Sequence, residues 1–166
     1  MVTVDSSSSK FSIYLYCALL ALPWIGVQTI WNTEFAVLSP TLKEFGLSDA
    51  ISTLAWIAGP ITGFFTAPFV GSYSDRSTFK FGRRRPFIIL GLALTILFSL
   101  LFAFANNFGT AARLPVAFIS FVCLDVTINI IQTPLRALGS DLAPQGYQET
   151  VQLFASVFQG LGGIIA

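Results

Sequence analysis

Stretches of apolar residues without any charge alternate along this chain with short polar segments. Residues 11–33 form the first such stretch, and about 20 apolar residues are enough for a helix to cross the roughly 30 Å hydrocarbon core of a bilayer. We therefore expect an all-α membrane protein with four complete transmembrane helices and a truncated fifth. The pattern predicts spans at about residues 12–38, 50–73, 86–105 and 114–139, and a fifth that begins near residue 151.

Helix breakers and small residues refine this prediction. Residues 39–49 contain Pro40 and several charges, so we predict an outer loop there, with the next helix capped near Ser48 or Asp49. Small residues in the second span are expected to let another helix approach closely, as helix packing in membranes requires. These small residues are Gly59, Gly63 and Gly71.

The composition excludes several function classes. Hydrophobic residues make up 54% of the chain, charged residues make up 10%, and the mean hydropathy is +0.76. A soluble enzyme is disfavoured, because too little polar surface remains for a soluble domain of this size. The sequence has no histidine, so histidine-based catalytic triads and the usual zinc sites are excluded. Cys17 and Cys123 lie in apolar runs without metal-ligand spacing. We expect no enzymatic activity and no cofactor.

Positive charge gathers in one short segment between two uncharged runs. Residues 71–86 hold five of the nine Lys and Arg residues, and the long uncharged runs around them disfavour a nucleic-acid binder. The positive-inside rule places this segment, Arg136 and the amino terminus on the cytoplasmic side. We expect residues 1–10 to be a disordered cytoplasmic tail and residues 11–166 to form one transmembrane bundle.

Polar residues recur on one face of the span at 114–139. Asp125, Asn129, Gln132 and Arg136 fall at i, i+4, i+7 and i+11, a spacing that keeps side chains on one side of a helix. A carboxylate in hydrocarbon costs on the order of 3 kcal/mol on insertion scales. Asp125 is therefore expected to face a water-filled cavity or a partner and to take up a proton. The alternative is that neutral Asp125 only donates a hydrogen bond between helices.

Arg136 lies too far along this helix to be the simple ion-pair partner of Asp125, because eleven residues rise about 16 Å. Pro134 between them offers a kink that swings Arg136 inward, where its guanidinium could neutralise another carboxylate or bind substrate hydroxyls. The alternative is an arginine that extends to the inner interface as a topology anchor.

Polar and aromatic residues also enter the first span. Glu34 lies in its outer third, preceded by Gln28, Trp31 and Asn32. An indole with amide neighbours is suited to stacking on a sugar ring and hydrogen-bonding it. The alternative is that Trp24 and Trp31 anchor the helix at the membrane interface.

Residues 71–87, GSYSDRSTFKFGRRRPF, carry a resemblance to a known family. They are similar to the first cytoplasmic-loop motif of sucrose transporters and their animal relatives, within the glycoside-pentoside-hexuronide:cation symporter family of the major facilitator superfamily. Ser77 stands where that family commonly has a cysteine. The likeness extends over the second and fourth spans, where the family has an aspartate and an arginine at the spacing of Asp125 and Arg136. The matching loop positions are Gly71, Asp75, Arg76, Gly82, Arg83, Arg84 and Arg85.

The resemblance implies a proton-coupled symporter of sucrose or a related sugar that works by alternating access in a plasma or vacuolar membrane. Asp125 would be the protonation site, and Arg136 would be required for transport. The loop would act as a cytoplasmic gate, in which Asp75 accepts donors from a neighbouring helix terminus and the arginines pair with acidic lipid or Asp141. The substrate-binding candidates are Arg136, Asn129, Gln132, Glu34, Gln28 and Trp31.

Members of this family have two six-helix halves, and substrate binds between them. This chain resembles the N-terminal part of such a transporter, and we expect the missing C-terminal half to be needed for activity. The expected partners are the lipid bilayer and a sugar such as sucrose, with protons as the coupling ion. The alternative is a truncated, non-transporting membrane protein that assembles with a full-length relative or modulates it.

Overall fold

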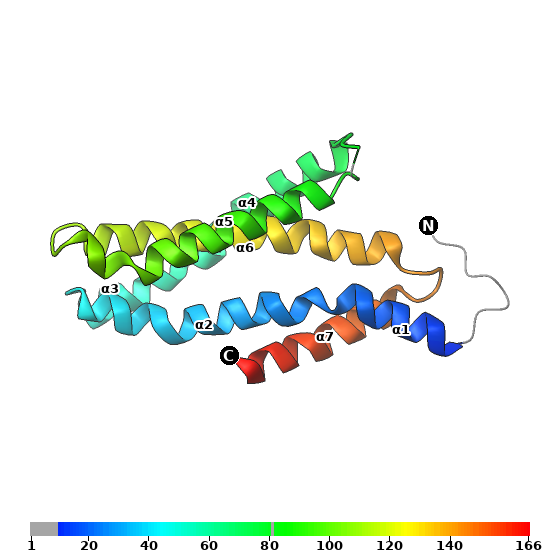
Figure 1. Ribbon diagram of the computed structural model, residues 1–166, viewed down its shortest axis with the longest axis horizontal. Coiled ribbons are helices and arrows are strands. Elements are labelled where there is room, and N and C mark those ends of the chain that lie inside the picture. The colour runs from blue at the N-terminus through cyan, green and yellow to red at the C-terminus, as the bar shows by residue number, and fades with distance from the viewer. Residues whose placement is uncertain (1–9, 81) are drawn as a thin grey trace. The chain divides into compact units, whose positions relative to one another are not determined.

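A computed structural model describes residues 10–80 and 82–166 of the chain, and within these residues the regular elements are helices (Figure 1). The predicted tail at residues 1–10 lies outside the described residues except for Lys10, with which the first helix begins. The described residues divide into two compact units. We call residues 10–34 and 136–166 the terminal unit and residues 35–135 the middle unit. The helices α2 (Pro23–Glu44) and α6 (Arg113–Leu142) contribute residues to both.

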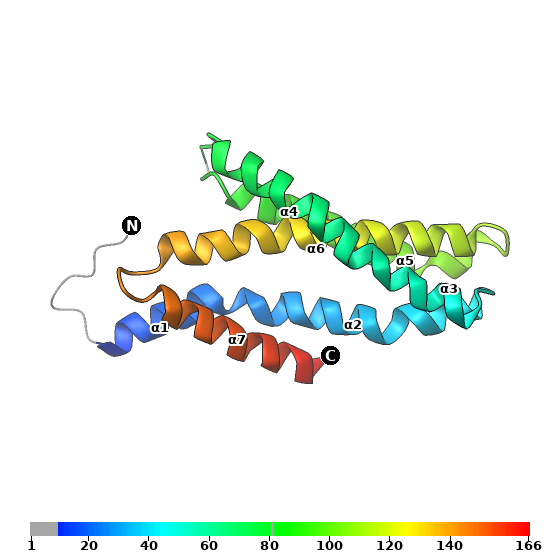
Figure 2. The same cartoon turned by 180° about the vertical axis from the view of Figure 1, so that it is seen from behind.

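In the terminal unit, α1 (Lys10–Ala21) and α7 (Gln148–Ile165) lie side by side (Figures 1 and 2). The rings of Tyr14 and Tyr147 meet edge to face, with their centroids 6.0 Å apart. The helix α7 also packs closely on α2, because a Cβ atom at Gly162 would collide with the carbonyl oxygen of Ile25. Glycine at this position therefore lets the two helices come into backbone contact.

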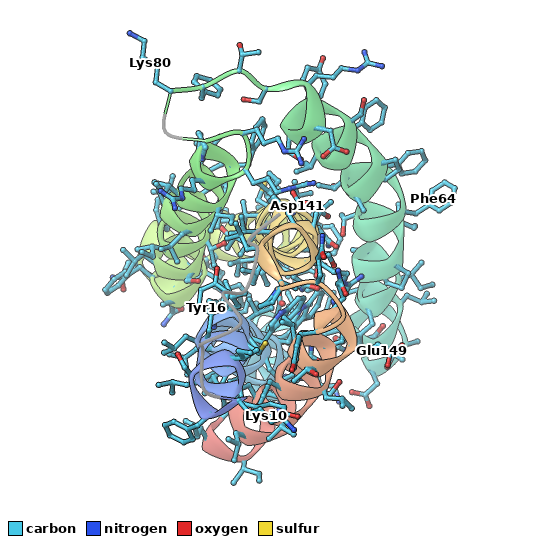
Figure 3. The ribbon with its side chains drawn as sticks, turned by 90° about the vertical axis from the view of Figure 1, so that its right-hand side faces the viewer. Lys10, Tyr16, Phe64, Lys80, Asp141 and Glu149 are labelled. Carbon is cyan, nitrogen blue, oxygen red and sulfur yellow. The ribbon has the colours of Figure 1, made fainter. Side chains whose placement is uncertain are left out.

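The middle unit is organised around α6. It contains the short helices α3 (Asp49–Leu54), η1 (Ala55–Ile57) and η2 (Ala105–Phe108), and the long helices α4 (Ala58–Arg76) and α5 (Arg85–Ala103). Figures 1 to 3 show α4 and α5 on opposite sides of α6. Ser48 caps α3, as predicted, since its hydroxyl accepts a hydrogen bond from the Ile51 amide at 3.5 Å. Pro86 occupies the first turn of α5, where no amide hydrogen is required.

The predicted loop at residues 39–49 is wrong over most of its length. The helix α2 continues through Pro40 and ends at Glu44. Gly46 follows with a φ of +102°, the left-handed conformation that glycine adopts just after helix ends. Leu38 and Leu42 on either side of Pro40 are fully buried. Burial of both side chains against the core outweighs the single backbone hydrogen bond that proline removes.

The core of the middle unit forms where α2, α6 and the short helices meet. Trp56 packs between the rings of Phe35 and Phe121, and its indole nitrogen donates a hydrogen bond to the Ser39 hydroxyl at 3.1 Å. The guanidinium of Arg113 lies over the ring of Phe45 at 5.1 Å. The buried members of this cluster are Leu38, Leu42, Phe45, Ala55, Ala105, Ala117 and Phe121.

Four helical segments within the described residues are long and apolar enough to cross a membrane. These segments confirm the positions of the four predicted spans, and α7 covers the predicted fifth apolar segment. The four segments are Lys10–Glu44, Asp49–Arg76, Arg85–Ala103 and Arg113–Leu142.

Candidate functional site

The polar face of α6 lies against the glycines of α4 within the middle unit. A Cβ atom at Gly59 would stand 3.5 Å from Oδ1 of Asp125, and one at Gly63 would stand 3.3 Å from Oδ1 of Asn129. Two turns further along α4, a Cβ atom at Gly71 would meet the Thr133 methyl group at 3.6 Å. The predicted close approach at these glycines is thus confirmed, and α6 is the helix that approaches.

Asp125 is the acidic residue of this face, and it is almost fully buried, with 1% of its surface exposed. Within residues 10–80 and 82–166, neither carboxyl oxygen of Asp125 has a hydrogen-bond partner. Asn129 directs its amide nitrogen to the backbone carbonyl of Asp125, at 2.8 Å, and not to the carboxyl group. An ionised carboxylate here would be buried without compensation, which is costly in a low-dielectric interior.

The next polar residues along α6 differ in exposure and in partners. Gln132 is partly buried, and its amide nitrogen makes no hydrogen bond within the part of the chain that the structure describes. Arg136, in the terminal unit, is exposed, and its guanidinium carbon lies 5.6 Å from the centroid of the buried Trp24 ring. This cation–π contact was missed from the sequence, because Trp24 lies in an apolar run and resembles an interface anchor.

Hydrogen bonds join polar residues of α2 to α7. The Gln28 amide donates to Oδ1 of Asn32 at 2.9 Å, and the Asn32 amide donates to the Gly163 carbonyl at 3.2 Å. Thr29 also donates to the Gly162 carbonyl at 3.3 Å. The roles of Asn32 and Thr29 in joining two helices could not be predicted, since their partners are backbone atoms more than 130 residues away in the sequence.

The other two predicted residues of α2 lie on the same stretch of helix. Glu34 is buried, with 6% of its surface exposed, and Trp31 is partly buried. Glu34 and Asp125 are the acidic residues with the least exposed surface among the described residues. The structure therefore places one buried carboxyl group in each unit.

The segment at 71–86 contains an internal ion pair. Arg84 contacts Asp75 at 3.0 Å, and only 9% of the Arg84 side chain is exposed, against 57% for Asp75. Arg84 immediately precedes the first residue of α5 and makes no side-chain capping hydrogen bond to it. The donor to Asp75 therefore comes from a neighbouring helix terminus, but it is a side chain and not a backbone amide. Gly82 has a φ of +98°, a conformation that other residues rarely adopt, and it lets the chain turn between the two helices.

The remaining predicted residues of this segment are more exposed. Arg76, Arg83 and Arg85 are exposed, and Figure 3 shows Lys80 at the outer edge of the segment. Asp141 lies at the end of α6 in the terminal unit and is partly buried (Figure 3).

Comparisons with known proteins agree with the membrane-spanning architecture. The sequence profile of the Major Facilitator Superfamily matches residues 6–166. Sucrose transport protein SUC3 from Arabidopsis thaliana is 32% identical over an alignment 179 residues long. The alignment covers 98% of this chain and 30% of that protein. Sucrose transport protein SUC4 from the same organism is 34% identical over 152 residues, covering 84% and 30%.

A rice relative gives the same result. Sucrose transport protein SUT5 from Oryza sativa subsp. indica is 33% identical over an alignment 178 residues long. The alignment covers 97% of this chain and 33% of that protein. The chain thus spans about a third of the length of these curated relatives. No solved structure matches.

Proposed function

Because this chain belongs to the Major Facilitator Superfamily, we propose that it forms part of a proton-coupled symporter of sucrose or a related glycoside, acting by alternating access. The relatives that it resembles are named as sucrose transport proteins. The proposal includes a cytoplasmic amino terminus and a plasma or vacuolar membrane. It treats residues 11–166 as one transmembrane bundle, preceded by a cytoplasmic tail.

The observation that carries the proposal is the buried carboxyl group of Asp125. Its oxygens have no hydrogen-bond partner within residues 10–80 and 82–166, although the side chain is almost fully buried. Proton uptake removes the charge that burial penalises, and proton release becomes favourable when water reaches the group in another conformation. Gly59 lets α4 pack directly against this group, since a Cβ atom there would stand in contact with Oδ1 of Asp125, at 3.5 Å.

The sugar-binding residues are proposed on chemical grounds. The guanidinium of Arg136 is exposed beside an aromatic ring, and the amide nitrogen of Gln132, which makes no hydrogen bond within residues 10–80 and 82–166, is a hydrogen-bond donor. Sugar hydroxyls need such donors, and a sugar ring stacks on an indole. The full proposed set is Arg136, Asn129, Gln132, Glu34, Gln28 and Trp31. Gln28 would first have to exchange its hydrogen bond to Asn32.

The segment at 71–86 is proposed as a cytoplasmic gate. The ion pair between Asp75 and Arg84 holds the end of α4 against the start of α5. A gate requires contacts that form in one conformation and break in another, and an ion pair with one exposed partner can exchange with water or with another charge. The proposed gate residues are Gly71, Asp75, Arg76, Gly82, Arg83, Arg84, Arg85 and Asp141.

A chimaera tests the proposal. Residues 10–166 would replace the matched segment of the Arabidopsis sucrose transport protein SUC3, and uptake of labelled sucrose would be measured in yeast that lacks sucrose uptake, with and without a protonophore. We expect protonophore-sensitive accumulation by the chimaera. Asp125→Asn should abolish this accumulation, because an amide cannot exchange a proton.

The matched control is Asp49→Asn, which removes a carboxylate that is 87% exposed. This variant should accumulate sucrose like the unmodified chimaera. Unchanged accumulation by the Asp125→Asn variant at equal surface expression contradicts the role of Asp125. A chimaera that reaches the surface and accumulates no glycoside contradicts sugar transport itself.

A further inference from the structure

The outer face of α4 carries aromatic residues that end at a cation. Phe65, Phe69, Tyr73 and Arg76 follow one another at i, i+4, i+8 and i+11, so they share one side of the helix. The three aromatic side chains are each more than half exposed. The glycines of α4 face α6 instead, and Figure 3 shows the neighbouring Phe64 pointing away from α6. This aromatic face is therefore available to lipid.

Two cavities adjoin Arg76 at the end of this face. One has a volume of about 430 Å³ and lies along the helix beside Pro68, Phe69 and Tyr73. The other, of about 330 Å³, lies beyond the helix end and is lined by Ser77 and Thr78 together with the rings of Tyr73, Phe79 and Phe87. Tyr73 and Arg76 line both cavities, so two largely apolar cavities meet at the same guanidinium.

Two residues that line the cavity beyond the helix end carry groups that suit a phosphate. Arg76 forms no ion pair within residues 10–80 and 82–166, whereas Arg84 nearby in the sequence is paired with Asp75. The hydroxyl oxygen of Ser77 is buried without a hydrogen-bond partner in the same part of the chain. A guanidinium and hydroxyl groups are preferred ligands of phosphate oxygens.

The position of Arg76 favours a lipid over a soluble phosphate. Arg76 ends the segment Asp49–Arg76, which is long and apolar enough to cross a membrane, and the exposed aromatic face of that segment leads up to it. The cavity beside Phe69 continues from there along the apolar part of the helix. We propose that these two cavities bind one anionic phospholipid, with its phosphate at Arg76 and Ser77 and an acyl chain along Phe69 and Tyr73.

The test measures which lipid the purified chain retains. The 166-residue chain would be equilibrated with equal amounts of phosphatidylglycerol and phosphatidylcholine in mixed micelles, and bound lipid would be counted by native mass spectrometry. We expect a preference for phosphatidylglycerol, and Arg76→Gln should reduce this preference at least about tenfold, the order expected for loss of a charge-assisted contact. Arg76→Lys retains the charge and should keep most of it.

Lys80→Gln is the matched control. It removes the same charge from the same segment at a residue that lines neither cavity and points away from the helices (Figure 3). Its effect on the preference should stay below about fivefold, the factor that one basic residue near an anionic surface contributes. Equal losses for Arg76→Gln and Lys80→Gln would show general charge attraction and overturn the proposal.

Three further outcomes decide the occupant. Ser77→Ala should weaken retention while leaving helicity unchanged, and it serves as the second probe if Arg76→Gln fails to fold. Competition by inorganic phosphate as effective as competition by phosphatidylglycerol would show a phosphate site without a lipid. Loss of the preference in the chimaera with the Arabidopsis transporter would show that protein covers this face, and would also overturn the proposal.

Discussion

Gly91 fixes how closely α5 and α6 approach each other, and Gly91→Ala should separate them. A Cβ atom at this position would stand 2.7 Å from Cγ1 of Ile131 and 3.1 Å from Cγ2 of Ile130. It would also stand 3.2 Å from the backbone nitrogen of Ile131, an atom that no rotamer change can move. One turn along α5, the Thr95 hydroxyl donates to the Thr127 hydroxyl at 2.9 Å in a fully buried contact.

The expected magnitude follows from two opposing terms. Overpacking of a well-packed contact costs about 1–3 kcal/mol, and the replacement of glycine by alanine within a helix returns roughly 0.5–1 kcal/mol. The free energy of unfolding should therefore fall by about 0–2.5 kcal/mol, with a central value of about 1 kcal/mol. Loss of the buried hydroxyl contact would add about 0.6 kcal/mol, the average for such bonds in membrane proteins.

Unfolding of the purified chain in mixed micelles by increasing sodium dodecyl sulfate, followed by helicity, measures this change. Gly71→Ala is the matched control, because its Cβ would meet Thr133 at an ordinary contact distance of 3.6 Å, and it should be neutral or slightly stabilising. In a double-mutant cycle, Ile131→Ala should relieve part of the cost of Gly91→Ala. Equal stability of the Gly91→Ala and Gly71→Ala variants would refute the packing argument.

Three further predictions concern other contacts. Gly162→Ala should loosen α7 from α2 and speed amide hydrogen exchange along α7, whereas Gly160→Ala, with no atom within 4 Å of its Cβ, should not; equal exchange in both variants would contradict the close packing. A double-mutant cycle with Asp75→Asn and Arg84→Gln should give a coupling energy above the roughly 0.2–1 kcal/mol of exposed pairs, since Arg84 is buried, and a coupling near zero would contradict an effective ion pair. Thr127→Val should cost about 0.6 kcal/mol and at most about 1.7 kcal/mol of unfolding free energy, and no measurable change would indicate that the hydroxyl contact does not stabilise the helix pair.

The membrane spans could be predicted from the sequence because apolar length alone decides whether a helix can cross a bilayer. The same local logic failed at Pro40, where burial of Leu38 and Leu42 keeps the helix going. A proline in the sequence indicates that one backbone hydrogen bond of a helix would be lost. The burial of Leu38 and Leu42 that compensates for this loss depends on residues that come close only in the folded chain.

The candidate site was only partly predictable for the same reason. The spacing of Asp125 and Asn129 places both on one face of a helix, and the glycines of α4 indicate that another helix packs closely there. No local sequence pattern predicts that these two faces contact each other. The stacking of Arg136 on Trp24 and the hydrogen bonds from Asn32 and Thr29 to α7 likewise depend on contacts distant in sequence. The sequence does not indicate which side chain will donate a hydrogen bond to the backbone carbonyl of a glycine, as Thr29 and Asn32 do to Gly162 and Gly163.

The short length of α5 has a consequence for the membrane around it. Its 19 residues rise about 28 Å, whereas the 30 residues of α6 rise about 45 Å. A plasma membrane is a few ångström thicker than an average bilayer, at roughly 32–33 Å of hydrocarbon. In such a bilayer α6 can tilt to match the thickness. The shorter α5 must instead place the residues at its ends inside the hydrocarbon or cause the bilayer around it to become thinner. Since Arg84 immediately precedes α5 and contacts Asp75 at the end of α4, we expect a change in bilayer thickness to alter the ion pair between these two helices.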